Sequence, residues 1–203
     1  PYTTLFRYRI DMSYCAISTG IGESNLESLD QIVKFLKPHF ICIDVANGYM
    51  SKFIETCRKI REKYPETILI AGNVCSQQGV LELVVNGKVD IVKVGIGSGS
   101  CCTTRKQTGI GMPQLSAIIE CADTAHGLDA HIISDGGLQV VGDFSKAYGA
   151  GADFVMSGSM FAGHEESGGE LIHDTNFEGD IIKSWKIFYG MSSTTAMNKY
   201  SGG

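Results

Sequence analysis

Short apolar runs alternate with amphipathic stretches along most of this chain, and this alternation limits its possible folds more than any other feature of the sequence. The apolar runs are too short for helices and are rich in isoleucine and valine, which is typical of strands buried on both faces of a parallel sheet. Six such strands are predicted, at Tyr14–Gly20, Phe40–Ala46, Thr67–Val74, Asp90–Gly97, His131–Gly137 and Asp153–Ser159.

Helical periodicity occupies most of the intervals between these runs. In the first interval, the apolar residues recur at the spacing that places them on one face of a helix. Helices are predicted at Ser24–Leu36, Ser51–Lys63, Gln77–Asn86, Pro113–His126 and Asp143–Gly149. Strands that alternate with helices in this way indicate βαβ units and a parallel sheet.

Two α/β architectures fit this rhythm, a doubly wound open sheet and a (β/α)8 TIM barrel. Residues suited to chemistry follow several predicted strands, at Asp44, Gly95–Gly99, Asp135–Gly137 and Gly158. A barrel brings the carboxyl ends of all its strands to one mouth, whereas an open sheet concentrates a ligand at one switch point. We therefore favour the barrel, with about six of its eight strands present. Residues 1–203 are interpreted as a single partial TIM-barrel catalytic domain.

The composition excludes several classes of protein. Hydrophobic residues make up 43% of the chain, and no apolar run approaches the roughly 18 residues of a membrane span, so no membrane partner is expected. The net charge of -5, without a basic stripe, gives no reason to expect nucleic-acid binding. The 7 cysteines include no CxxC pair, which indicates reduced thiols in a cytoplasmic protein and neither a disulfide framework nor a zinc site.

One polar segment interrupts the alternation of strands and helices. Residues 163–187 contain His164, Glu165 and Glu166 and end close to Trp185. We interpret this segment as a flap or loop insertion, because loops of this kind often close over substrates.

The most informative stretch for function is Val94–Gly111, which reads VGIGSGSCCTTRKQTGIG. Its small residues let the backbone pass close to a ligand or curl its carbonyl groups around an ion. A thiol near Arg105 and Lys106 is expected to have its thiolate form favoured, which is the setting of a nucleophile. From these residues alone, an ordinary glycine-rich turn with a buried cysteine is the alternative.

The segment GSGSCCTTR resembles the catalytic loop shared by IMP dehydrogenases and GMP reductases, in which a Gly-x-Gly-Ser-x-Cys-x-Thr pattern carries the nucleophile. DVANGY, HIISDGG, ESGGE and FYGMSS further resemble motifs of the reductase branch and follow one another in the same order. The resemblance extends from about Cys15 to Gly203. It implies an oxidoreductase that uses NADPH to convert GMP to IMP and ammonia, in purine nucleotide salvage and interconversion.

The resemblance assigns the chemistry to Cys102 and Thr104. Cys102 would attack C2 of the purine and form a covalent thioimidate, and Thr104 would relay a proton to the departing ammonia. Cys101 falls on a variable position of the pattern. The site implied for a monovalent cation, taken as K+, consists of the carbonyl groups of Gly97, Gly99 and Cys102, with Arg105 beside it.

The resemblance also assigns two nucleotide sites. The residues implied to bind GMP or IMP are Asp135, Gly136, Gly137, Gly158, Ser159, Gly190, Met191 and Ser192. Those implied for NADPH are Asp44, Val45, Ala46, Ile96, Gly97 and Met191. Asp135 would accept hydrogen bonds from ribose hydroxyls, and the glycines would offer N–H groups to phosphate. From the residues alone, a Gly-Gly turn with a helix-capping aspartate is the preferred interpretation of Asp135, and Asp44 is equally a structural charge at the end of a strand.

The sequence departs from the family at both ends. Pro1–Ser13 matches none of the family's motifs, two strands that normally precede Tyr14–Gly20 are missing, and the catalytic Glu is expected beyond Gly203. The alternatives are an IMP dehydrogenase that oxidises IMP, against which the TTR and FYGMSS motifs argue, and a catalytically incomplete fragment that binds a nucleotide. The resemblance implies a homotetramer. We expect the chain alone to be unstable, because two sheet edges would be unpaired.

Overall fold

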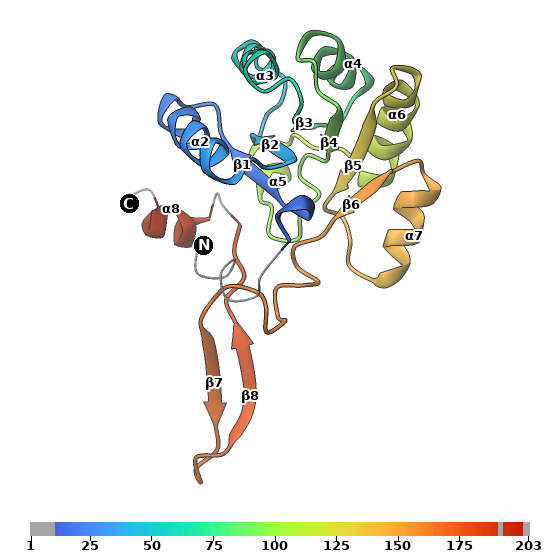
Figure 1. Cartoon of the computed structure of the whole chain (residues 1–203). Helices are drawn as coiled ribbons and strands as arrows, with labels where there is room; N and C mark the ends of the chain where they lie inside the picture. The colour runs from blue at the N-terminus through green and yellow to red at the C-terminus, as the bar shows by residue number, and fades with distance from the viewer. Residues whose placement is uncertain (1–10, 191–192, 201–203) are drawn as a thin grey trace.

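A six-stranded parallel sheet lies at the centre of the computed structural model of this chain, which describes residues 11–190 and 193–200 (Figure 1). The strands are β1 (Ala16–Thr19), β2 (Phe40–Asp44), β3 (Ile68–Val74), β4 (Ile91–Val94), β5 (His131–Asp135) and β6 (Phe154–Met156). Each strand lies inside one of the predicted apolar runs, so all six strand predictions are confirmed.

The order of the strands decides between the two architectures. The sheet runs β1-β2-β3-β4-β5-β6, so each strand pairs in parallel with its neighbours in the sequence. A doubly wound sheet reverses its order at a switch point, and no reversal occurs among the described strands. Sequential parallel order is that of a (β/α) barrel, and the curved sheet forms an open part of one, here called the half-barrel (Figure 1). The barrel prediction is therefore confirmed.

Five helices cover the outer face of the sheet (Figure 1). They are α2 (Glu23–Leu36), α3 (Ser51–Lys63), α4 (Gln77–Leu81), which continues into the π-helical turn η2 (Glu82–Asn86), α6 (Gln114–Gly127) and α7 (Val141–Gly149). In α3, Phe53, Cys57 and Ile60 recur three or four residues apart and are all buried. Burial of such a stripe is what holds these helices against the sheet. The five predicted helices are confirmed to within a few residues at each end.

Alternate residues of the strands build two separate clusters of buried side chains. Ile41 and Ile43 of β2 pack with the helices in the main core, as do Val92 and Val94 of β4. The intervening residues point to the other face, where Cys42, Ile70 and Ile91 form a small cluster inside the half-barrel. Burial on both faces explains why the strands read as nearly continuous apolar runs.

Three short elements lie outside the predicted pattern. They are the 3-10 turn η1 (Met12–Tyr14), α5 (Thr104–Thr108) and α8 (Thr194–Tyr200). None of the residues of α5 is buried, so its sequence has no apolar periodicity by which a helix could be predicted. Within residues 11–190 and 193–200, no helix is long and apolar enough to cross a membrane.

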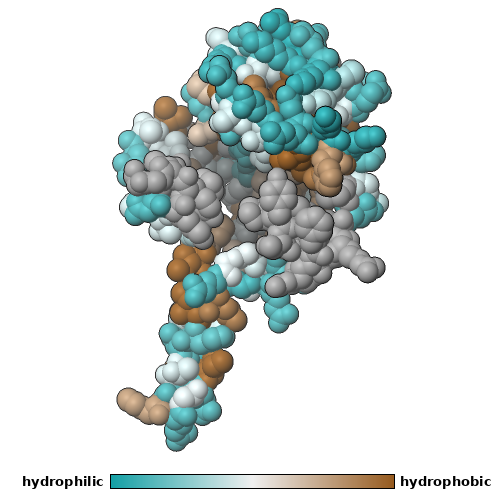
Figure 2. Space-filling model, turned by 60° about the vertical axis from the view of Figure 1, so that its left-hand side comes forward, coloured by the Kyte–Doolittle hydropathy of each residue, from teal (hydrophilic) through white to brown (hydrophobic). Residues whose placement is uncertain are grey.

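An antiparallel hairpin projects away from the half-barrel (Figure 1). Its strands are β7 (Leu171–Thr175) and β8 (Ile181–Lys186), within the segment predicted to be a flap or loop insertion. Across the two strands, Trp185 Nε1 donates to Asp174 Oδ2 at 2.7 Å. Within β8, Lys183 Nζ lies 3.6 Å from the centre of the Trp185 ring. Apolar side chains gather on the part of the hairpin nearest the barrel (Figure 2). The role of this segment as a flap stays a prediction.

The start of α7 makes a pH-dependent contribution to stability. The Asp143 carboxylate accepts hydrogen bonds from Lys146 Nζ at 2.9 Å and from the N–H groups of Gln139 at 2.9 Å and Val140 at 3.1 Å. Lys146, and then these N–H groups, lower the pKa of Asp143 from 3.8 to about 2. Because the pKa is lower in the folded state, the contribution is present above pH 3.8 and is lost as pH falls towards 2.

We therefore expect Asp143→Asn to lower the melting temperature at neutral pH, and the difference from the unmodified protein to vanish near pH 2. Melting curves followed by circular dichroism across this pH range measure the effect. Asp123→Asn, at an exposed aspartate of α6, is the matched control and should change the melting temperature little at any pH. Equal melting temperatures of the Asp143 variant and the unmodified protein at neutral pH would contradict the prediction.

Candidate active site

A cavity of about 590 Å³ opens where β4, β5 and β6 end. This volume lies in the range of about 300–1,000 Å³ that is typical of small-molecule sites. Many of the residues predicted to bind or react line the cavity together: Gly99, Cys102, Thr104, Asp135, Gly136, Gly137, Gly158, Ser159 and Gly190. The structure thus brings the loop after β4, the turn after β5 and the turn after β6 to one site, as expected for the mouth of a barrel.

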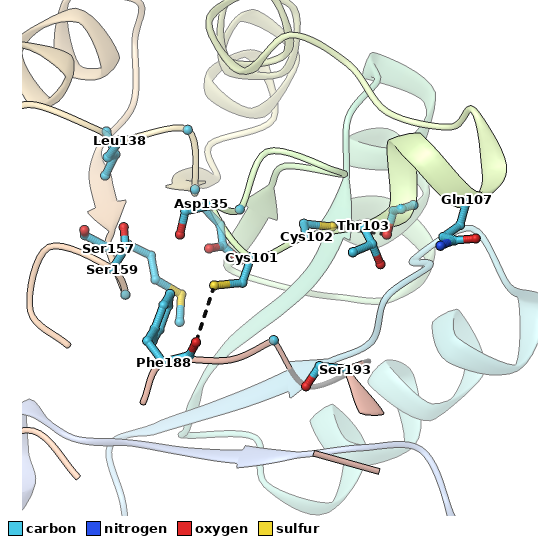
Figure 3. A pocket seen from close by; sticks show the side chains of 18 of the residues that line it. Cys101, Cys102, Thr103, Gln107, Asp135, Leu138, Ser157, Ser159, Phe188 and Ser193 are labelled. Carbon is cyan, nitrogen blue, oxygen red and sulfur yellow. Dashed lines mark hydrogen bonds between the residues drawn. The ribbon is translucent and has the colours of Figure 1, made fainter. Parts of the chain in front are cut away.

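The two predicted reacting groups lie side by side in the cavity wall. Cys102 is exposed, and its Sγ donates to Oγ1 of Thr104, the first residue of α5, at 3.2 Å. The N–H of Cys102 donates to the carbonyl of Gly99 at 3.0 Å, which closes the loop into a turn. Figure 3 shows Cys102 on this loop, with its sulfur directed towards Thr103, and Cys102 and Asp135 both line the cavity. An accessible thiol with a hydroxyl in contact suits a nucleophile and a proton relay.

The turn after β5 packs tightly against the cysteine loop. Gly137 N–H donates to the carbonyl of Ser98 at 2.9 Å, and Ser98 Oγ donates to the carbonyl of Asp135 at 2.8 Å. Gly136 has a φ of +85°, and a Cβ on it would lie 2.8 Å from Ser98 Oγ and 3.0 Å from the nitrogen of Gly99. Only glycine combines this backbone conformation with such a close approach. The two glycines of the SDGG motif therefore hold the cysteine loop in place.

A buried lysine joins two of the predicted aspartates. Lys93 of β4 is 2% exposed, and its Nζ donates to Asp135 Oδ2 at 2.8 Å and to Asp44 Oδ2 at 3.0 Å. Asn73 Nδ2 also donates to Asp135 Oδ2, at 2.9 Å. Burial alone would disfavour the charged ammonium, but the two carboxylates outweigh it and raise the pKa of Lys93 above its usual value. Asp44 and Asp135 are therefore linked through one cation.

Comparison with known proteins identifies the family. The family model described as the IMP dehydrogenase / GMP reductase domain matches residues 9–203. The chain belongs to this family.

Relatives within the IMP dehydrogenase / GMP reductase family are similar over nearly all of the chain. GMP reductase 2 of Homo sapiens is 54% identical over 193 residues, which cover 95% of this chain and 53% of that protein. GMP reductase of Caenorhabditis elegans is 53% identical over 188 residues, 92% of this chain and 51% of that protein. The chain spans about half the length of the curated relatives it matches.

A solved structure resembles the fold. It is a crystal structure of GMP reductase C318A from Trypanosoma brucei in complex with guanosine 5'-monophosphate, with a TM-score of 0.81 and 31% sequence identity. The match covers 88% of this chain and 36% of that chain. A half-barrel is therefore the part of the family fold that this chain carries.

The residues that the family resemblance implies for the cofactor lie beside the cavity, outside its lining. Asp44 is the last residue of β2 and is followed by Val45 and Ala46, and the carboxylate of Asp44 turns towards Lys93. Ile96 is 8% exposed, so little of it can contact a ligand. Among the residues that line the cavity, none belongs to this set. Met191 and Ser192 lie outside the described residues.

The residues implied for the cation occupy the start of the cysteine loop. Gly97 has a φ of +75°, and the side chain of Arg105 lies directly against it. The guanidinium of Arg105 donates to the carbonyl of Met112, and Arg105 does not line the cavity. A guanidinium has no lone pair to offer a metal ion. Arg105 can therefore lie next to a cation held by this loop but cannot coordinate it.

Several residues of the site were not predicted from the sequence. Cys101 lines the cavity beside Cys102, and its Sγ donates to the carbonyl of Phe188 at 4.0 Å (Figure 3). The other unpredicted residues of the lining are Ser100, Thr103, Gln107, Leu138, Met156, Ser157, Phe188, Ser193 and Thr194. The sequence does mark Lys93, which is the single charged residue within the otherwise apolar strand β4. A buried charge requires an oppositely charged partner, so a paired lysine could have been predicted here.

Proposed function

We propose that the protein to which this chain belongs is a GMP reductase, which converts GMP and NADPH to IMP, ammonia and NADP+. The observation that carries the proposal is that Cys102, Thr104, Asp135 and the turn after β6 line one cavity, with Cys102 in contact with Thr104. The identity of 54% with GMP reductase 2 of Homo sapiens supports the choice of reaction within the family.

The reaction would proceed through the sulfur of Cys102. The thiolate adds to C2 of the guanine ring, and the bond from C2 to the exocyclic amino group breaks to leave a thioimidate. Thr104 Oγ1, in contact with the sulfur, passes a proton to the departing ammonia. NADPH, when bound, supplies the hydride for C2. The bond between C2 and sulfur then breaks, so IMP is released and the Cys102 thiolate is regenerated.

The binding of GMP would use residues from three strand ends. The Asp135 carboxylate, which lines the cavity, would accept hydrogen bonds from ribose hydroxyls. The N–H groups of Gly136 and Gly137 already donate to the carbonyls of Met156 and Ser98. These glycines therefore support phosphate binding through close approach of their backbone and not through free N–H groups.

The phosphate would then depend mainly on the turn after β6. Within the described part of the chain, the N–H groups of Gly158 and Ser159 donate to no carbonyl. The carbonyl of Gly158 accepts the N–H of Phe161 at 3.1 Å, which closes the turn. The N–H groups at the start of this turn are not used by the turn itself. Free N–H groups at the start of such a turn suit an anion. Gly190, which also lines the cavity, would contact the base.

The cysteine loop has a donor set that fits a monovalent cation. Carbonyl oxygens are hard ligands, which suit K+ and do not require a carboxylate cage. The Gly99 carbonyl accepts the N–H of Cys102 through one lone pair, which leaves its second lone pair for an ion. Gly97, Gly99 and Cys102 would hold the ion, and Arg105 would lie beside it. The NADPH site would contain the exposed residues Asp44 and Ala46, with Val45, Ile96, Gly97 and Met191. A homotetramer and a cytoplasmic location stay predictions.

The proposal predicts oxidation of NADPH in the presence of GMP. The test uses the longest form of the protein that its transcript encodes, and follows the loss of NADPH absorbance together with the formation of IMP and ammonia. We expect one IMP and one ammonia for each NADPH consumed. Formation of NADH from IMP and NAD, without reduction of GMP, would instead indicate an IMP dehydrogenase. Binding of GMP without either reaction would indicate a protein that only binds the nucleotide.

A further inference from the structure

Among the residues that the structure describes, Lys93 is the one charged residue that is buried. It lies on the inner face of the half-barrel, two residues after Ile91 of the inner cluster, in a strand whose other residues are all apolar. A buried charge is tolerated only when it is paired and hydrogen-bonded, so a lysine at this position requires a compensating reason.

A glycine on the neighbouring strand leaves room for the side chain of Lys93. The neighbouring position on β3 is Gly72, where a Cβ would lie 2.5 Å from Lys93 Cβ and 2.6 Å from its carbonyl oxygen. On the far side of Gly72, its register partner on β2 is Asp44. Because Gly72 has no side chain, Lys93 can extend across β3 to Asp44 on β2. The Nζ of Lys93 also contacts Asp135 on β5, the strand on the opposite side of β4.

The two oxygens of the Asp135 carboxylate have different surroundings. Oδ2 accepts hydrogen bonds from Lys93 Nζ at 2.8 Å and Asn73 Nδ2 at 2.9 Å. Oδ1 accepts none from the residues that the structure describes. Asp135 itself lines the cavity, with 23% of its side chain exposed, and points into the space in front of the cysteine loop (Figure 3). One oxygen is thus held by the protein and the other is left for a ligand.

We propose that Lys93 is a positioning residue that sets the preference of the site for a ribonucleotide over a deoxyribonucleotide. Together with Asn73 it fixes Oδ2 of Asp135. The carboxylate is then held in one orientation, with Oδ1 presented to a hydroxyl of the ribose. This inference rests on the proposed function, because it takes GMP as the nucleotide and Asp135 as the acceptor for its ribose.

Loss of the lysine should act mainly on this preference. Without the ammonium, the carboxylate of Asp135 loses the hydrogen bond from Lys93 and can rotate, so a ribose hydroxyl loses an acceptor at a fixed position. A hydrogen bond to a charged group contributes enough to change affinity by about 10- to 100-fold. The ratio of the affinities for GMP and a deoxy analogue reports this contact, whereas a general loss of folded protein lowers the number of binding sites for both ligands and leaves the ratio unchanged.

The test is isothermal titration calorimetry of the longest form of the protein that its transcript encodes, with GMP, 2'-deoxy-GMP and 3'-deoxy-GMP. The unmodified protein should bind GMP about 10- to 100-fold more tightly than at least one of the analogues. In Lys93→Met, which keeps the length of the side chain and removes its charge, that ratio should fall to about threefold or less. Lys52→Met, at an exposed lysine in the first turn of α3, is the matched control and should keep the full ratio.

A double-mutant cycle separates positioning from a direct contact. Asp135→Asn removes the charged acceptor, so it should lower the ratio by itself, and Lys93→Met should then add no further loss. If Lys93→Met does not fold, Asn73→Ser removes the other donor to Oδ2 and should lower the ratio by a smaller amount. An undiminished ratio in the folded Lys93 or Asn73 variant would overturn the inference while leaving the proposed function intact. Absence of GMP binding by the unmodified protein would instead overturn the proposed function, and this inference with it.

Discussion

Replacement of Cys102 with serine is expected to lower the rate of GMP reduction by about a thousandfold or more. Serine keeps the approximate size of the side chain and can still contact Thr104, which lies 3.2 Å from the sulfur. A serine hydroxyl is a much weaker nucleophile than a thiolate near neutral pH, so the covalent step is lost. Loss of NADPH absorbance measures the rate. Intact-mass spectrometry after incubation with GMP should show a nucleotide adduct on the unmodified protein and none on the variant.

The neighbouring Cys101 provides the matched control for this experiment. It lines the same cavity, but its Sγ is directed at the carbonyl of Phe188 and not at a hydroxyl that could relay a proton. Cys101→Ser should therefore lower the rate by less than about tenfold and should retain the adduct. The opposite ranking of the two variants would assign the nucleophile to Cys101 and would show that the proposed pairing of Cys102 with Thr104 is wrong.

Phe53→Ala is expected to lower the free energy of unfolding by about 3–5 kcal/mol. Phe53 is 0% exposed and packs in the main core between α3 and the sheet. Removal of the ring loses its burial and leaves a cavity that the tightly packed surroundings can only partly fill. For a chain of this size the melting temperature should fall by about 6–20 °C. Thermal melting followed by circular dichroism measures the shift.

Phe35 on α2 is the control for the same substitution in a different environment. It is 82% exposed, so Phe35→Ala should change the free energy of unfolding by no more than about 0.5 kcal/mol. Comparable losses for Phe35→Ala and Phe53→Ala would contradict the assignment of the core to the space between the sheet and the outer helices.

The strands and most of the helices could be predicted from the sequence because each is marked by a local pattern. The run that contains Ile41, Cys42 and Ile43 is apolar on both faces, and α3 has a stripe with helical spacing. These patterns reflect burial, which is the dominant favourable contribution to folding. The helix α5 could not be predicted in this way, because it buries no residue and depends on the conformation of the loop on either side of it.

The candidate site was predictable only in part. The glycines and Cys102 of the loop after β4 stand together in the sequence, and the resemblance to the family extended the prediction to Asp135 and the turn after β6. The contact between Cys101 and Phe188 was not predictable, because 87 residues separate these two positions and nothing local marks their pairing. Their proximity follows from the path of the chain after β6.

The sequence by itself determined the alternation of strands and helices, the nature of the loop that carries the thiol and the membership of the family. Each of these depends on residues that are close together in the chain or on motifs in a given order. Only the tertiary structure decided that Lys93, Asp44 and Asp135 form one charged cluster, since the register of β2, β3 and β4 and the absence of a side chain at Gly72 set those contacts. Charges far apart in the sequence interact strongly only when folding removes the water between them, and that depends on how the strands are aligned.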